Sequence, residues 1–135
     1  MAASPQFKAF LAELLEPLGP LVFKRLFGGE GLSLGGVTFA FIMGETLYMR
    51  VDDASRVAYE DAGMDSFSYS TKQRRVQVRS FFAAPEELFD DGEEFCDWAR
   101  TALAAAQVAA REKAAKQARK TPRKQTGRGS LQTAP

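Results

Sequence analysis

Two-residue gaps between short apolar runs are the feature that most limits how this chain can fold. Residues 37–43 (VTFAFIM) and 46–51 (TLYMRV) are rich in strand-forming residues, and only Gly44-Glu45 separates them. Such a short connection joins antiparallel strands, because parallel strands need a crossover of a dozen or more residues. The segment 21–52 therefore predicts three antiparallel strands in a meander, with GGEG at 28–31 as a turn or bulge.

Amphipathic helices are predicted on both sides of these strands. Ser4 and Pro5 are typical of a helix start, and Pro17 of a helix end. Between them apolar residues recur at spacings of three and four, on one face of the helix: Phe7, Phe10, Leu11, Leu14, Leu15 and Leu18. After the strands, Asp52 or Asp53 is expected to cap a second helix.

The last predicted helix is long and changes character along its length. From Glu93 apolar residues recur at helical spacing, and Trp98 among them is expected to be buried between the helix and the sheet. The apolar pattern weakens after Ala110. Pro122 is expected to end the helix, because proline lacks the amide hydrogen that an interior helical position donates.

Two further strands are predicted at 67–69 and 76–82, on either side of a basic turn. The element order is then α-β-β-β-α-β-β-α. This order predicts an α+β fold of two layers, with helices on one face of an antiparallel five-stranded sheet. A length of 135 residues suits one domain, which we assign to residues 1–110. Residues 111–135 are expected to form a basic C-terminal extension that is partly helical and then, over 121–135, disordered.

The chain has no histidine and one cysteine, Cys96. Histidine-based catalysis, histidine-containing metal sites, internal disulfides and thiolate clusters are therefore excluded. We expect no catalytic residue, no cofactor and no metal site. A single cysteine fits the reducing cytoplasm. No run of residues is apolar enough for a membrane span, so no membrane partner is expected.

The net charge of +1 hides a strong asymmetry. Residues 111–135 contain eight basic residues and one acidic residue, whereas residues 1–110 contain ten basic and sixteen acidic residues. A basic tail on an acidic body indicates sequence-independent contact with nucleic-acid phosphates, with a solubilising helix end as the alternative. The candidate nucleic-acid residues of the tail are Lys113, Lys116, Arg119, Lys120, Arg123, Lys124 and Arg128.

The predicted hairpin at 67–82 is a second candidate for contact with nucleic acid. Its basic residues are Lys72, Arg74, Arg75 and Arg79, and they alternate with the aromatic residues Phe67, Tyr69, Phe81 and Phe82. Basic and aromatic residues together can bind single-stranded nucleic acid. The alternative is that the hairpin is charged to stay soluble and to protect a sheet edge.

Three other patterns are better explained by structure than by chemistry. The glycines at 28–31 lack the lysine and the following helix of a phosphate-binding loop. The acidic run at 86–97 lacks the spacing of a calcium loop and lies where helices start, which is where acids are favoured. Cys96 has acidic neighbours, which raise a thiol pKa and disfavour a nucleophilic role.

Five blocks of sequence resemble the TfoX N-terminal domain family, found at the front of bacterial competence regulators and as stand-alone proteins. The blocks are LAELLEPLG at 11–19, KRLFGGEGL at 24–32, FAFIMGETLYMRVDD at 39–53, YEDAGMDSFSY at 59–69 and APEELFDDGEEFCDWARTAL at 84–103. The likeness spans about residues 7–106. It departs from the family at Leu26, where methionine is usual, at Ser33, where an aromatic residue is usual nearby, and at Ser66, where proline is usual.

The resemblance implies a two-layer fold similar to secretion chaperones, a role in regulating competence or gene expression, and no catalytic residues. Our first hypothesis is a non-enzymatic regulatory or interaction domain of the bacterial cytoplasm that contacts nucleic acid through its tail. The alternative is a protein-binding adaptor or chaperone-like homodimer, for which the tail is incidental. Its protein partner would be unknown.

Overall fold

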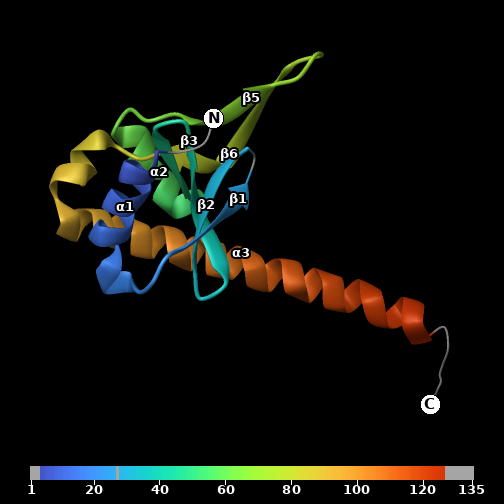
Figure 1. Cartoon of the computed structure of the whole chain (residues 1–135). Coiled ribbons are helices and arrows are strands. Elements are labelled where there is room, and N and C mark those ends of the chain that lie inside the picture. Colours follow the sequence, from blue (N-terminus) through green and yellow to red (C-terminus); the bar gives the residue numbers. More distant parts are fainter. Residues whose placement is uncertain (1–3, 27, 127–135) are drawn as a thin grey trace.

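The structure, a computed structural model, describes residues 4–26 and 28–126, with the side chains of the last helix as far as Ala118. Within these ranges six antiparallel strands form one sheet in the order β1-β2-β3-β4-β6-β5, accompanied by three α-helices (Figure 1). The strands are β1 (Val22–Leu26), β2 (Gly29–Leu34), β3 (Val37–Met43), β4 (Thr46–Arg50), β5 (Ser66–Ser70) and β6 (Arg75–Ala83). The helices are α1 (Pro5–Leu14), α2 (Asp53–Asp61) and α3 (Gly92–Thr126), with short 3-10 turns η1 (Glu16–Leu18) and η2 (Glu86–Asp90).

The predicted α+β class and antiparallel sheet are confirmed. None of the described helices is both long and apolar enough to span a bilayer.

The sheet has six strands rather than the five predicted, because the glycine-rich segment forms part of a strand. Gly28 has a positive φ of 84° and makes the turn, but β2 begins at Gly29 and pairs with both β1 and β3. A Cβ atom on Gly29 would lie 1.9 Å from the backbone oxygen of Ile42. Glycine is therefore required here for two strands to approach closely, a role that strand propensities do not reveal.

One face of the sheet packs against the helices and forms the main core. α1 and its C-cap contribute Leu11 and Leu15, α2 contributes Tyr59 and α3 contributes Phe95, all of which are buried. The strands contribute Leu32, Leu34, Phe39, Ala40, Ile42, Leu47, Met49 and Phe82, and Val51 follows directly after β4. Burial raises the pKa of the Tyr59 hydroxyl, because the charged phenolate would lose its hydration there.

The buried side of α3 is rotated relative to the prediction. Cys96 and Ala99 are buried, whereas Trp98 is only half-buried and packs edge-on against Tyr59 of α2 with ring centroids 4.7 Å apart. The prediction that Trp98 is buried between α3 and the sheet is wrong. Small side chains at positions 96 and 99 let the helix lie close to the sheet, and the larger indole lies at the margin where it covers α2.

α3 also continues past its predicted end. The helix extends through Pro122 to Thr126, so the prediction that Pro122 stops it is wrong. A proline removes one amide donor, and a long helix keeps its other backbone hydrogen bonds on both sides of that gap. The prediction of disorder over 121–135 is wrong for residues 121–126, which are helical, and residues 127–135 lie outside the described residues.

The second face of the sheet carries its own aromatic cluster of Phe41, Tyr48, Phe67 and Phe81. Phe41 lies on β3 and Phe67 on β5, with β4 and β6 between them, yet their ring centroids are only 4.9 Å apart. Strands of a flat sheet lie ~4.8 Å apart, so these positions would be separated by about 14 Å. The sheet therefore curls strongly toward this face, with pairing-register shifts at Leu32/Ser33 and Ser66/Phe67.

The N-cap of α2 makes the stability of the protein depend on pH in a way that can be tested. Asp52 is its N-cap: its carboxylate accepts a hydrogen bond from the Ser55 amide at 2.8 Å, and the Ser55 hydroxyl accepts one from the Asp52 amide at 3.0 Å. These bonds, led by the Ser55 amide, hold the pKa of Asp52 below its ordinary value of 3.8. The stabilisation by the charged cap is therefore complete above about pH 4 and is lost as the pH falls through the lower folded-state pKa.

We expect Asp52→Ala to lower the free energy of unfolding by about 0.5–2 kcal/mol at pH 7. The difference from the unsubstituted protein should narrow at pH 3, in urea unfolding followed by circular dichroism. Asp52→Asn keeps an acceptor oxygen but cannot ionise, so it serves as the control. If Asp52→Ala lowered the free energy of unfolding equally at pH 7 and pH 3, this would contradict the role of the charged Asp52 carboxylate as the N-cap of α2.

Candidate nucleic-acid interface

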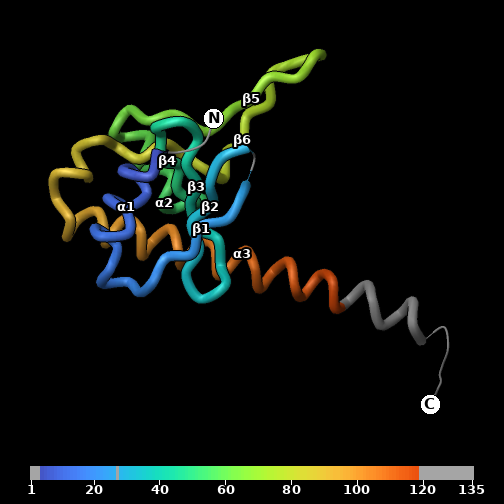
Figure 2. The backbone as a smooth tube through the Cα atoms, viewed as in Figure 1, coloured from blue at the N-terminus to red at the C-terminus, as the bar shows by residue number. Residues whose placement is uncertain are grey.

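The C-terminal half of α3 leaves the body of the domain. Its last buried residue is Ala106, and every side chain from Ala110 to Ala118 is exposed. The helix runs on without a break and projects away from the sheet (Figures 1 and 2). This α3 extension, residues 107–126, displays Arg111, Lys113 and Lys116 among its described side chains. The predicted residues Arg119, Lys120, Arg123 and Lys124 lie on its last turns, and Arg128 lies outside the described residues.

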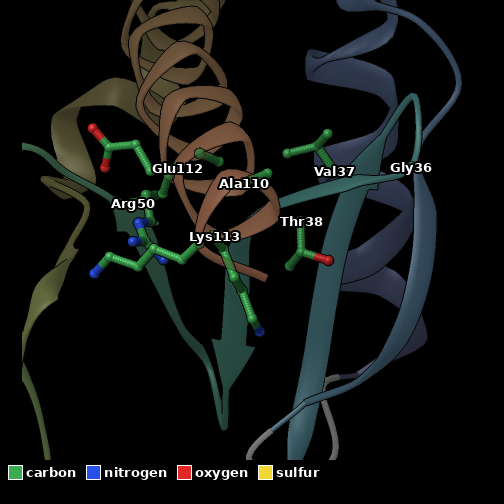
Figure 3. Close-up of a pocket in the computed structure, with 10 residues that line it drawn as sticks. Gly36, Val37, Thr38, Arg50, Ala110, Glu112 and Lys113 are labelled. Carbon is green, nitrogen blue, oxygen red and sulfur yellow. The ribbon is translucent and has the colours of Figure 1, made fainter. Parts of the chain in front are cut away.

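A cleft of about 490 Å³ opens where α3 passes the start of β3 and the end of β4. It is lined by Gly36, Val37, Thr38, Arg50, Ala106, Ala109, Ala110, Glu112, Lys113 and Lys116. In Figure 3, Arg50 and Thr38 lie on either side of the helical turn that carries Lys113. The alanines keep this side of the helix narrow, which leaves room for the cleft beside the strands.

The charge of this cleft is predominantly positive. Three cationic side chains, Arg50, Lys113 and Lys116, line it together with one carboxylate, Glu112. The Arg50 guanidinium lies 5.4 Å from the centre of the Phe81 ring, a cation–π contact that restrains it. Among the described residues none of the three cations forms an ion pair. Cations without a carboxylate partner, one of them restrained by an aromatic ring, are suited to binding an anion.

Sequence reasoning did not include Arg50 in this site. The alternation along 46–51 places Arg50 with Tyr48 on the face away from the main core, which indicates only that Arg50 is not a core residue. What the pattern could not show is that α3 passes close enough to bring Lys113 to the same cleft. That proximity depends on how α3 crosses the sheet.

The β5–β6 hairpin forms a second basic projection, away from the α3 extension (Figure 1). Its tip is a turn in which the Thr71 amide donates to the Arg74 carbonyl at 2.7 Å. The four predicted cations have different surroundings. Arg75 donates to the Ser68 hydroxyl at 2.8 Å, and Arg79 lies 3.6 Å from a carboxylate oxygen of Glu60. Lys72 and Arg74 are exposed at the tip.

The four aromatic residues of the hairpin are also separated by the fold. Phe67 and Phe81 are buried in the aromatic cluster, and Phe82 is buried in the main core. Tyr69 alone among the four is exposed, at 47%. It is the aromatic side chain of this hairpin that a ligand can reach.

The patterns attributed to structure have structural roles. Asp91 accepts a hydrogen bond from the Glu94 amide at 3.2 Å, and Asp97 pairs with Arg100 at 2.8 Å. Across the described ranges, no three histidine, cysteine, aspartate or glutamate side chains come together in a group that could hold a metal ion. The Cys96 thiol is buried and donates to the Leu14 carbonyl at 3.1 Å, and burial raises its pKa.

A family model, the TfoX N-terminal domain, matches residues 13–106. The chain belongs to the TfoX N-terminal domain family. A comparison with curated proteins gave no match. The region shared with the family ends at Ala106, which is also the last buried residue of α3. The family match thus covers the curled sheet, α2 and α3 as far as Ala106, whereas most of α1 and the whole α3 extension lie outside it.

Proposed function

We propose that this chain is a non-enzymatic regulatory or interaction domain, of the kind found in competence regulators, that contacts nucleic acid through its α3 extension. The observation that carries the proposal is the unpaired cationic surface of Arg50, Lys113 and Lys116, at the point where the helix leaves the domain. Membership of the TfoX N-terminal domain family supports the regulatory role.

The chemistry of this surface favours phosphates over a particular base sequence. Lys113 and Lys116 are three residues apart and therefore lie on neighbouring turns of one helix face. Lysine contacts to phosphate position a protein on nucleic acid without reading its sequence, and most of the binding free energy comes from released counterions. Binding should therefore be weakly sequence-selective and steeply dependent on salt.

The test is binding of the full chain to a random-sequence DNA duplex at several salt concentrations. We expect the double substitution Lys113→Gln with Lys116→Gln to weaken binding. It should also reduce the slope of log affinity against log salt by about two, close to one for each phosphate contact removed. The matched control is Lys24→Gln with Arg25→Gln, which removes two exposed cations from β1 and should retain the slope.

Equal effects of the two double substitutions would mean that net charge, and not the α3 extension, determines binding. Absence of duplex binding even at low salt would remove nucleic acid from the proposal. It would favour the alternative of a protein-binding adaptor or chaperone-like homodimer. A sedimentation measurement of the same sample then tests for the dimer.

A further inference from the structure

The outer half of the β5–β6 hairpin combines an exposed aromatic ring on one face with exposed cations at its tip. Tyr69 pairs with Val76 and Phe67 pairs with Val78, so these four side chains share a face. Arg74 lies in the tip turn, two residues before Val76, and its side chain is exposed. Arg75 alternates to the opposite face, where it reaches Ser68.

A hollow lies beside the exposed ring on this hairpin. It has a volume of about 460 Å³ and is lined by Met43, Phe67, Ser68 and Tyr69. The Tyr69 and Phe67 rings are tilted by 34° with centroids 6.1 Å apart, so they form two walls rather than a closed stack. Phe67 is fixed from behind by edge contacts with Phe41 and Tyr48. The hollow is thus an apolar, partly aromatic surface with a rigid floor.

The charge around this hollow indicates what can fill it. Every charged residue between 66 and 83 is a cation. Arg79 faces Glu60, whereas Lys72 and Arg74 form no ion pair with any described residue. A ligand that matches both features carries a flat ring and a nearby negative charge. An unpaired nucleotide has this chemistry, whereas a duplex hides the faces of its bases.

We propose that the hairpin binds single-stranded nucleic acid, with one unpaired base stacked on Tyr69 over the hollow and the adjoining phosphates held by Lys72 and Arg74. This inference rests on the proposed function only in taking nucleic acid as the class of ligand. It uses none of the residues of the α3 extension. The two contacts therefore differ in the form of nucleic acid that they prefer, and each can fail without the other.

The test compares binding of the full chain to a twelve-nucleotide oligothymidine and to a random-sequence DNA duplex, at one salt concentration. We expect Tyr69→Leu to weaken oligothymidine binding by about five- to a hundredfold, the usual effect of losing one stacked base. Duplex binding should stay unchanged. Tyr69→Phe keeps the ring and should retain affinity for the oligothymidine. Because Tyr69 is exposed, both variants are expected to keep the thermal midpoint of the unsubstituted protein.

A charge-matched pair tests which face of the hairpin is used. Arg74→Gln should weaken oligothymidine binding more than Arg75→Gln, although both remove one positive charge from adjacent positions. Equal losses for this pair, or unchanged binding by Tyr69→Leu, overturn the inference. If oligothymidine binding depends on Tyr69 while the Lys113 and Lys116 substitutions leave duplex binding intact, the inference stands and the role of the α3 extension fails. The reverse pattern retains the α3 extension and rejects the hairpin.

Discussion

Replacing Phe41 with alanine should lower the free energy of unfolding by about 3–5 kcal/mol. Phe41 has no exposed surface and lies at the centre of the aromatic cluster on the face of the sheet opposite the helices. Its ring centroid lies 5.2 Å from that of Tyr48, 4.9 Å from that of Phe67 and 5.0 Å from that of Phe81. Truncation leaves a cavity that three rings on three different strands cannot fill without distorting the sheet. Urea unfolding followed by circular dichroism measures the loss.

Phe10→Ala is the matched control for this prediction. It makes the same chemical change on α1, at a side chain that is 39% exposed and that packs, within the described part of the chain, against the ring of Phe89. We expect a distinctly smaller loss, because less apolar surface is buried there. If both substitutions shifted the urea midpoint equally, the second face would contribute no core of its own and the explanation of the curled sheet would be wrong.

Gly29→Ala is expected to be the second severe substitution, although it adds only one methyl group. The new Cβ atom would lie 1.9 Å from the Ile42 backbone oxygen, and backbone cannot rotate away as a side chain can. Strands β2 and β3 must then separate locally. We expect a loss of at least about 1–3 kcal/mol, the usual cost of overpacking, measured as the fall in thermal midpoint and in urea midpoint.

Gly92→Ala provides the comparison for Gly29→Ala. At the start of α3 the added Cβ atom meets only Leu14, at an ordinary contact distance of 3.4 Å. Alanine is also the better helix former, so this change should be neutral or slightly stabilising. A Gly29→Ala protein as stable as the Gly92→Ala protein would show that β2 and β3 do not approach as closely as described.

The sequence was sufficient for features that depend on neighbouring residues. Ser4 and Asp52 cap their helices as expected, and the gap at Gly44-Glu45 joins antiparallel strands. The strand at Gly29–Leu34 was missed because its first three residues have little strand propensity. It forms because β1 and β3 pair with it on both sides, so tertiary structure and not local propensity determines this strand.

The same distinction explains the candidate site. Lys113 and Lys116 could be recognised from the charge pattern alone, but Arg50 joins them only through the path of α3 across the sheet. Likewise, four aromatic residues of the hairpin were equivalent in sequence. The curl of the sheet buries Phe67 and Phe81, the main core takes Phe82, and Tyr69 remains exposed. Exposure is a property of the whole fold and cannot be read from local spacing.

The α3 extension shares one uninterrupted helix with the core, and this gives it the mechanical character of a lever arm rather than that of a tether. Twenty residues beyond Ala106 reach about 30 Å at the usual rise per residue. Each added or deleted residue in that arm would turn everything beyond it by about 100° around the helix axis. The number of residues between Ala106 and Lys113 therefore fixes the direction in which the lysines point around the helix axis relative to Arg50. The length of this segment thus determines how a ligand bound to the lysines is oriented on the domain.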